Sequence, residues 1–328
     1  MPAPIRRSGV LTFLSALLLI SIGGAAIPSL IGSTLLLTLL TQATIDAILA
    51  SGVGFMMRQN GLVSFGHAAF FGMAGYTVAL MVAHRVGPVE LAVVAAIALP
   101  SLFAFLLGLA ILRLSGTAFS MLTLAVAQAL YQLVLKWRAL ANGDDGIQVN
   151  LPDHLFGVDV AVFQQPASMF LICWAMLMLL LLGLWLLSRS AFGTLTVAIR
   201  ENEERARFIG YQTMLPRALI YAISAAIGAL GGVLFALYNG FISPDALYWS
   251  LSGEALVMAV IGGTRNIWGP ALGAVIFFLL KDAAGDLTEH WQAIIGGALI
   301  VVTVLLPGGV SGALVAAVGR LQKRSSGM

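Results

Sequence analysis

Long apolar stretches separated by short polar connections run along almost the whole chain. Ten of them can be marked, at residues 10–30, 34–57, 64–83, 88–112, 117–137, 167–187, 217–238, 247–263, 267–281 and 291–306. A helix that crosses the ~30 Å hydrocarbon core of a bilayer needs about 20 apolar residues. The pattern therefore predicts an all-α, polytopic transmembrane helical bundle of eight to ten spans, with ten favoured.

Two regions of this pattern are interrupted by glycine and polar residues, at 64–83 and across 247–281. Irregular backbone at membrane depth is tolerated only where it is buried in protein or lines a water-filled path. Each region is therefore expected either to cross fully or to form a broken or re-entrant segment. Only two connections are long, the one at 138–166 and the one at 188–216.

The composition agrees with a membrane protein. Of the 328 residues, 60% are hydrophobic and 9% are charged, whereas roughly a quarter of an average soluble domain is charged. So few polar groups cannot cover the surface of a soluble chain of this length, and lipid must cover it instead. Ten spans would leave room for one membrane domain over 1–328 and for no separate soluble domain.

The basic residues are distributed unevenly about ten alternating spans. With the N-terminus placed in the cytoplasm, thirteen fall on the cytoplasmic side: Arg6, Arg7, Arg58, Arg113, Arg189, Arg200, Arg205, Arg207, Arg217, Arg265, Arg320, Lys323 and Arg324. Four fall outside: Arg85, Lys136, Arg138 and Lys281. Because Lys and Arg resist translocation, this predicts cytoplasmic termini, a cytoplasmic connection at 188–216 and an external one at 138–166. The first stretch is expected to be a retained signal-anchor helix, since a second span follows at once.

Signatures of other functions are missing from the sequence. It contains no G-x-x-x-x-G-K-[ST], H-E-x-x-H or G-x-S-x-G motif. The four histidines are too scattered to indicate a metal site. No basic cluster is interleaved with aromatic residues, as in nucleic-acid-binding proteins. We therefore expect no enzymatic activity, no bound metal or cofactor, and no nucleic-acid partner.

Two acidic residues lie within apolar stretches, Asp46 in TQATIDAILA and Glu254 in SLSGEALVMAV. A carboxylate at membrane depth is costly unless it is paired or hydrated, so it normally faces the protein interior. One interpretation is a proton or ion site, which would make the chain an ion-coupled secondary transporter. The other is a carboxylate satisfied by neighbouring Thr, Ser or Gly backbone groups or lying near an interface.

The segment NGLVSFGHAAFFGMAGY, at 60–76, combines glycines with a serine and a histidine in an apolar setting. Small residues permit close helix packing. One interpretation is that Ser64, Gly66 and His67 line a translocation pathway. The alternative is a tight helix crossing in which His67 bonds to a backbone carbonyl.

Charge is concentrated in one place, at residues 200–207 within the connection 188–216. The six charged residues of mixed sign are Arg200, Glu201, Glu203, Glu204, Arg205 and Arg207. The pattern predicts a short surface helix with local ion pairs, ended by Gly210, with Pro216 starting the next span. The helix is either simply solvated or a docking element for a cytoplasmic partner.

Five ordered blocks resemble the permeases of ABC importers, and specifically branched-chain amino acid permeases of the LivM type. They are GLVSFGHAAFFGMAGY at 61–76, NGDDGI at 142–147, RSAFGTLTVAIRENEERARFIGY at 189–211, GGVLFALYNGFISPD at 231–245 and EALVMAVIGGTRNIWGPALGA at 254–274. The resemblance implies a multi-pass subunit of a bacterial inner membrane. It also implies three kinds of partner: a second related permease, two cytoplasmic ATP-binding subunits and an external solute-binding protein.

The resemblance further implies a coupling loop that sits in a cleft of the ATPase, through which ATP acts without binding to this chain. ABC importers carry an E-A-A-x-x-x-G pattern there; Glu204, Ala206 and Gly210 fall in register, with Arg205 in place of the middle alanine. The residues expected to couple are Arg200, Glu201, Glu203, Glu204, Ala206, Arg207 and Gly210. The implied solutes are leucine, isoleucine and valine, with urea, short amides or aromatic acids as the alternative.

Overall fold

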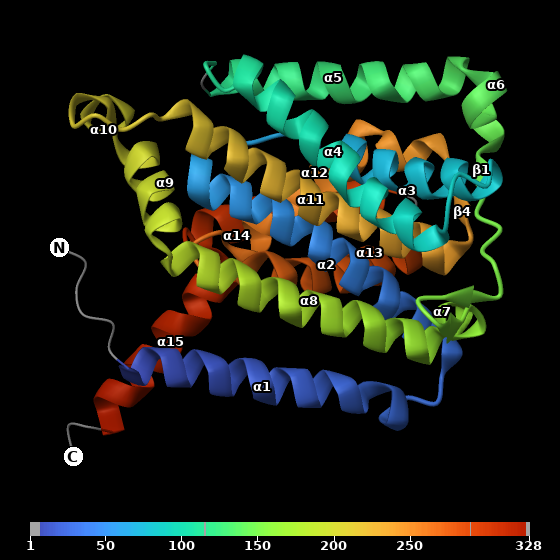
Figure 1. Cartoon of the computed structure of the whole chain (residues 1–328). Coiled ribbons are helices and arrows are strands. Elements are labelled where there is room, and N and C mark those ends of the chain that lie inside the picture. Colours follow the sequence, from blue (N-terminus) through green and yellow to red (C-terminus); the bar gives the residue numbers. More distant parts are fainter. Residues whose placement is uncertain (1–6, 115, 289, 326–328) are drawn as a thin grey trace.

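The computed structural model describes residues 7–114, 116–288 and 290–325, and within them the chain is an all-α bundle, as predicted (Figure 1). A helix occupies each of the ten predicted stretches. These helices are α1 (Arg7–Leu30), α2 (Thr34–Asn60), α3 (His67–Ala83), α4 (Val89–Ile111), α5 (Thr117–Lys136), α8 (Pro166–Arg189), α11 (Met214–Asn239), α12 (Trp249–Gly262), α13 (Gly269–Leu287) and α14 (Trp291–Leu305).

The connections hold additional short elements that the apolar pattern does not predict. Between α5 and α8 lie α6 (Arg138–Ala141), η1 (Gly143–Asp145), β1 (Ile147–Gln148), β2 (His154–Leu155), β3 (Val158–Asp159) and α7 (Ala161–Gln164). Between α8 and α11 lie α9 (Ala191–Glu201) and α10 (Glu203–Phe208); β4 (Phe241–Ile242) and η2 (Pro244–Leu247) follow α11, and α15 (Gly309–Ser325) follows α14. A two-residue strand has no periodicity to detect, because its pairing depends on a distant partner.

Five described helices are long and apolar enough to cross a membrane: α2, α4, α5, α8 and α11. The pair α14 and α15, bent by 44°, would make a sixth span if it is taken as one. Both interrupted regions are broken by non-helical backbone, because α3 begins only at His67 and residues 263–268 separate α12 from α13. The total of ten crossings and the sidedness of the termini stay predictions. Arg6 lies outside the described residues, as do the side chains of Arg7, Arg320, Lys323 and Arg324.

Close approach of glycine-bearing helices holds the centre of the bundle together, around α2, α3 and α11. A Cβ atom on Gly232 of α11 would lie 2.0 Å from the carbonyl oxygen of Phe71 on α3, and one on Gly72 would lie 2.4 Å from Leu247. Only glycine permits these distances, because a side-chain carbon does not approach a non-bonded atom so closely. The close packing expected from the small residues of the 60–76 segment is therefore present.

The two long connections lie at opposite ends of the bundle (Figure 1). One end carries α9 and α10, beside the last turns of α2 and α8 and the first turn of α11. The other end carries α6, α7 and an antiparallel ladder in which Ile147 of β1 pairs with Ile242 of β4. The chain therefore places its charged connection at one end and its longest irregular connection at the other.

Candidate functional site

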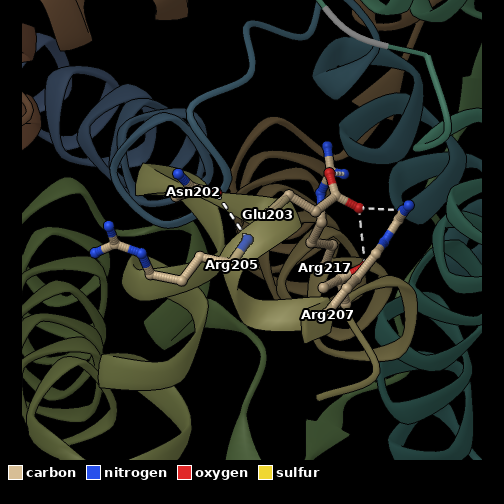
Figure 2. A network of polar contacts seen from close by, with 6 residues as sticks. Asn202, Glu203, Arg205, Arg207 and Arg217 are labelled. Atoms are coloured by element: carbon tan, nitrogen blue, oxygen red, sulfur yellow. Dashed lines mark hydrogen bonds and ion pairs between the residues drawn. The ribbon is translucent and has the colours of Figure 1, made fainter. Parts of the chain in front are cut away.

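The charged segment forms two short helices rather than the single predicted one. Asn202 breaks the run: it adopts an extended conformation (φ −157°, ψ 96°), and its side-chain oxygen accepts a hydrogen bond from the Arg205 backbone N–H at 2.8 Å (Figure 2). Asparagine favours such an N-cap position because its short side chain satisfies an otherwise unpaired amide. α9 and α10 therefore meet at a capped corner whose direction is fixed.

One face of α9 is held against the ends of α2 and α8. Gly193, Thr196 and Ile199 recur every three residues and are buried. The Thr196 hydroxyl donates to Oε1 of Gln59 at 2.9 Å, and Nε2 of Gln59 donates to the Ser188 hydroxyl at 3.3 Å. Three elements are thus joined by side-chain hydrogen bonds, so α9 is a docked part of the bundle and not a loose loop.

The Glu203 carboxylate joins α10 to α11 (Figure 2). It lies 2.5 Å from the Arg207 guanidinium and 2.8 Å from the Arg217 guanidinium, and it accepts a hydrogen bond from the Thr213 hydroxyl at 2.8 Å. Partial burial by itself would raise the pKa of Glu203, but the Thr213 hydroxyl, Arg217 and Arg207 together hold that pKa below its ordinary value. Glu203 is therefore ionised at neutral pH and ties the segment to the first turn of α11.

A second attachment runs through Arg200 at the end of α9. Its guanidinium donates to the carbonyl oxygen of Arg58 at 2.5 Å, and it lies 3.8 Å from the carboxylate of Glu201. Arg58 in turn donates to the carbonyl oxygen of Arg265 in the turn between α12 and α13. Arg200 and Glu203 thus face the bundle, whereas Glu201 is largely exposed.

The remaining residues of the segment form an exposed patch, which we call the α10 outer surface. It consists of Glu204, Phe208, Ile209, Gly210 and Tyr211, with Phe208 90% exposed and Ile209 69% exposed. Ala206 is buried beneath it. The helix ends at Phe208, before Gly210, whose φ of +91° favours glycine although the space around it is open. α11 begins at Met214, so Pro216 lies in its first turn and does not start it.

Asp46 and Glu254, the two acids at membrane depth, come together in the fold. Nζ of Lys281 on α13 lies 2.9 Å from Oε2 of Glu254 on α12, and Asp46 on α2 interacts electrostatically with both groups. Nε2 of Gln42 donates to Asp46 at 3.2 Å. Glu254 is therefore paired with a lysine rather than with Thr, Ser or backbone groups. Because α13 runs on to Leu287, Lys281 lies inside a helix and not in the external connection to which it was assigned.

Ser64, Gly66 and His67 form a separate, fully packed node where the chain enters α3. Nε2 of His67 lies 2.6 Å from the hydroxyl of Ser224, which itself donates to the carbonyl oxygen of Gly52 at 2.7 Å. The backbone N–H of Gly66 donates to the Ser64 hydroxyl at 3.1 Å. His67 thus contacts the Ser224 hydroxyl of α11. Ser64 and His67 are 1% and 0% exposed, so in this conformation they face packed protein.

Buried polar nodes, glycine-mediated helix crossings and several apolar spans define a multi-pass helical membrane protein. Residues 35–304 match the family described as the permease component of the branched-chain amino acid transport system, and the chain belongs to that family. It is thus a permease component of an ABC-type transporter, a class that works with ATPase and substrate-binding partners. The resemblance seen in the sequence blocks is confirmed.

Relatives with established names are similar over different shares of the chain. The high-affinity branched-chain amino acid transport system permease proteins LivM of Salmonella typhimurium and Escherichia coli are 27% and 26% identical, over 82% of this chain and 68% of each relative. The autoinducer 2 import system permease protein LsrC of Klebsiella pneumoniae is 31% identical over 50% of this chain and 49% of its own length. No solved structure matches the chain.

Proposed function

We propose that this chain is a permease subunit of a bacterial inner-membrane ABC importer that carries leucine, isoleucine and valine. The observation that supports this solute class is the extent of the similarity. The LivM proteins match 82% of the chain, whereas LsrC matches 50% of it. A permease for urea, short amides or aromatic acids is the second candidate, because its membrane subunit would share the same fold.

The proposed partners are a second related permease, two cytoplasmic ATP-binding subunits and an external solute-binding protein. The α10 outer surface is the part of the chain that the ATPase would contact. Exposed Phe208 and Ile209 next to Glu204 give an apolar patch with a charged edge, which is typical of protein interfaces. Through Glu203 and Thr196, movement of this patch would be passed to α11 and α2.

Reconstitution tests the proposed function. The chain is inserted into proteoliposomes with its co-encoded second permease and ATPases, and uptake of radiolabelled L-leucine is followed with the binding protein outside and ATP inside. We expect uptake that requires ATP and all partners, and that unlabelled isoleucine and valine compete for. Ion-driven uptake by this chain alone would instead establish a secondary transporter using Asp46 or Glu254, and competition by urea or acetamide only would establish the second candidate.

A further inference from the structure

Three ionisable side chains from three helices meet at membrane depth, and their charges do not balance. We call Asp46, Glu254 and Lys281 the intramembrane charge cluster. Lys281 forms an ion pair with Glu254 at 2.9 Å. Among the described residues Asp46 has no ion pair of its own and accepts one hydrogen bond, from Gln42. One lysine therefore serves two carboxylates: it forms an ion pair with Glu254 and acts on Asp46 only electrostatically, without an ion pair.

A polar stripe on α2 leads to this uncompensated carboxylate. Thr38, Gln42 and Asp46 follow one another at intervals of four residues, which places them on one face of the helix. All three are partly exposed, whereas every residue of α2 from Ala47 to Met56 is buried. The stripe thus starts near the end of α2 that the proposed topology places outside, and it stops at Asp46 against packed protein.

The open side of the cluster cannot face lipid. The side chain of Lys281 is 40% exposed and that of Glu254 is 26% exposed. Charged groups at membrane depth face the bundle interior or water, because hydrocarbon solvates them poorly. A surface hollow of about 350 Å³ adjoins Lys281. It is lined by Phe278, Lys281, Asp282, Gly285 and Trp291. Water or a polar solute is therefore the natural neighbour of the exposed part of Lys281.

We propose that Asp46 is a solute-binding residue of the translocation pathway and receives the ammonium group of the transported amino acid. This inference rests on the proposed function and assigns that function a site. An ammonium group carries a full positive charge and three N–H donors, so it matches a carboxylate that lacks a cation. Urea and short amides carry no charge and gain little from Asp46. Because Glu254 and Lys281 neutralise each other, Asp46 is the carboxylate that accepts the ammonium group.

The first test replaces Asp46 in the complete transporter. Asp46→Asn keeps the size of the side chain and removes its charge, so uptake of L-leucine at low concentration should fall about tenfold, the loss expected for one charged hydrogen bond. Asp46→Glu should retain most of the activity. The matched control is Asp153→Asn, the same change at an exposed position in the connection 138–166, and it should have no effect. Co-purification of the partner subunits shows whether each variant assembles.

A second test does not depend on the Asn variant remaining folded. Cys173 is the only native cysteine and is buried, so Gln42→Cys introduces one accessible thiol on the polar stripe. A positively charged thiosulfonate reagent should modify it, and L-leucine should slow that modification in the assembled transporter whereas urea should not. Absence of modification, or equal rates with and without L-leucine, would contradict a solute site at Asp46.

The outcomes separate the inference from the function on which it rests. If the wild-type complex shows no ATP-driven uptake, the proposed function fails. If the wild type carries L-leucine and Asp46→Asn carries it at the same rate, only the assignment of Asp46 fails. The assignment also fails if the wild type carries urea or acetamide but no amino acid, while the chain stays an ABC permease.

Discussion

At the scale of single residues, two acidic side chains are each paired with a basic side chain that is distant in the sequence. Arg217 pairs with Glu203 across 14 positions of sequence, and Lys281 pairs with Glu254 across 27. Both acids are conspicuous in the sequence, Glu254 because charge within an apolar stretch is unusual and Glu203 because it lies in the charged run 200–207. Their partners are not, since a distant pair leaves no local spacing to recognise. Sequence reasoning therefore identifies the acids and the local pair of Glu203 with Arg207, and misses the distant partners.

Glu203 gives a prediction that depends on pH. Its pKa lies below the ordinary value of 4.5 in the folded chain, so the ionised form stabilises the folded attachment of α10. That stabilisation is present above pH 4.5 and is lost as the pH falls through the lowered pKa. Glu203→Gln should remove it at neutral pH and reduce amide-exchange protection of α10 about fivefold, or ~1 kcal/mol for a partly exposed pair.

Hydrogen exchange of wild type and variant, corrected for intrinsic rates at each pH, measures this effect. Glu201→Gln is the matched control, because the Glu201 carboxylate is 70% exposed and its nearest guanidinium lies at 3.8 Å. It should leave the exchange of α10 unchanged. Equal protection in wild type and Glu203→Gln at neutral pH would show that α10 is held by packing alone.

At the scale of elements, apolar patterning predicted the helices well and the connections poorly. Each of the ten stretches contains a helix, because the need to satisfy every backbone group in lipid leaves a long apolar run little alternative. The apolar pattern could not show where each helix ends, because an apolar run does not by itself set the length of a helix. α12 ends at Gly262 because the chain must turn there and pack α13 against it. Asn202 was a findable signal, since an N-cap residue within a charged run predicts a break.

Glycine positions in helices differ sharply in what they tolerate, and this gives a prediction about packing. A methyl group on Gly232 would lie 2.0 Å from the Phe71 carbonyl oxygen, so Gly232→Ala must push α11 away from α3. Gly183 in α8 has no atom within 4 Å of the same position. We expect Gly232→Ala to lower the melting temperature in detergent, at a cost of about 1–3 kcal/mol. Gly183→Ala should leave it unchanged or raise it; similar behaviour of the two variants would contradict the close helix contact.

At the scale of the whole molecule, α2 connects the two regions to which we assign function. Its middle carries Asp46 in the intramembrane charge cluster, and its last turn carries Gln59 and Asn60, which are hydrogen-bonded to α9 and α11. A shift of α9 would therefore act directly on the helix that holds the proposed solute site. The node of Ser64, Gly66 and His67 packs against the same helix. The sequence could identify both groups of polar residues in apolar stretches. It could not predict that the intramembrane charge cluster is partly exposed and the Ser64–His67 node is packed, because burial depends on the fold.

Coupling across the molecule can be tested at the α10 outer surface. Glu204 is exposed, and Gly210 needs a φ of +91° that a bulky residue adopts only at a cost of about 1–3 kcal/mol. Neither residue holds α10 to the bundle, so Glu204→Lys and Gly210→Leu should insert normally but misplace the surface that the ATPase contacts. In proteoliposomes we expect ATP hydrolysis to continue while L-leucine uptake falls at least about tenfold. Asp153→Lys, an equal charge reversal in the connection 138–166, should leave ATPase co-purification and hydrolysis unchanged. Normal uptake in both variants would mean that the ATPase contacts another part of the chain. α10 can pass a movement of the ATPase on to α11 only if the ATPase touches it.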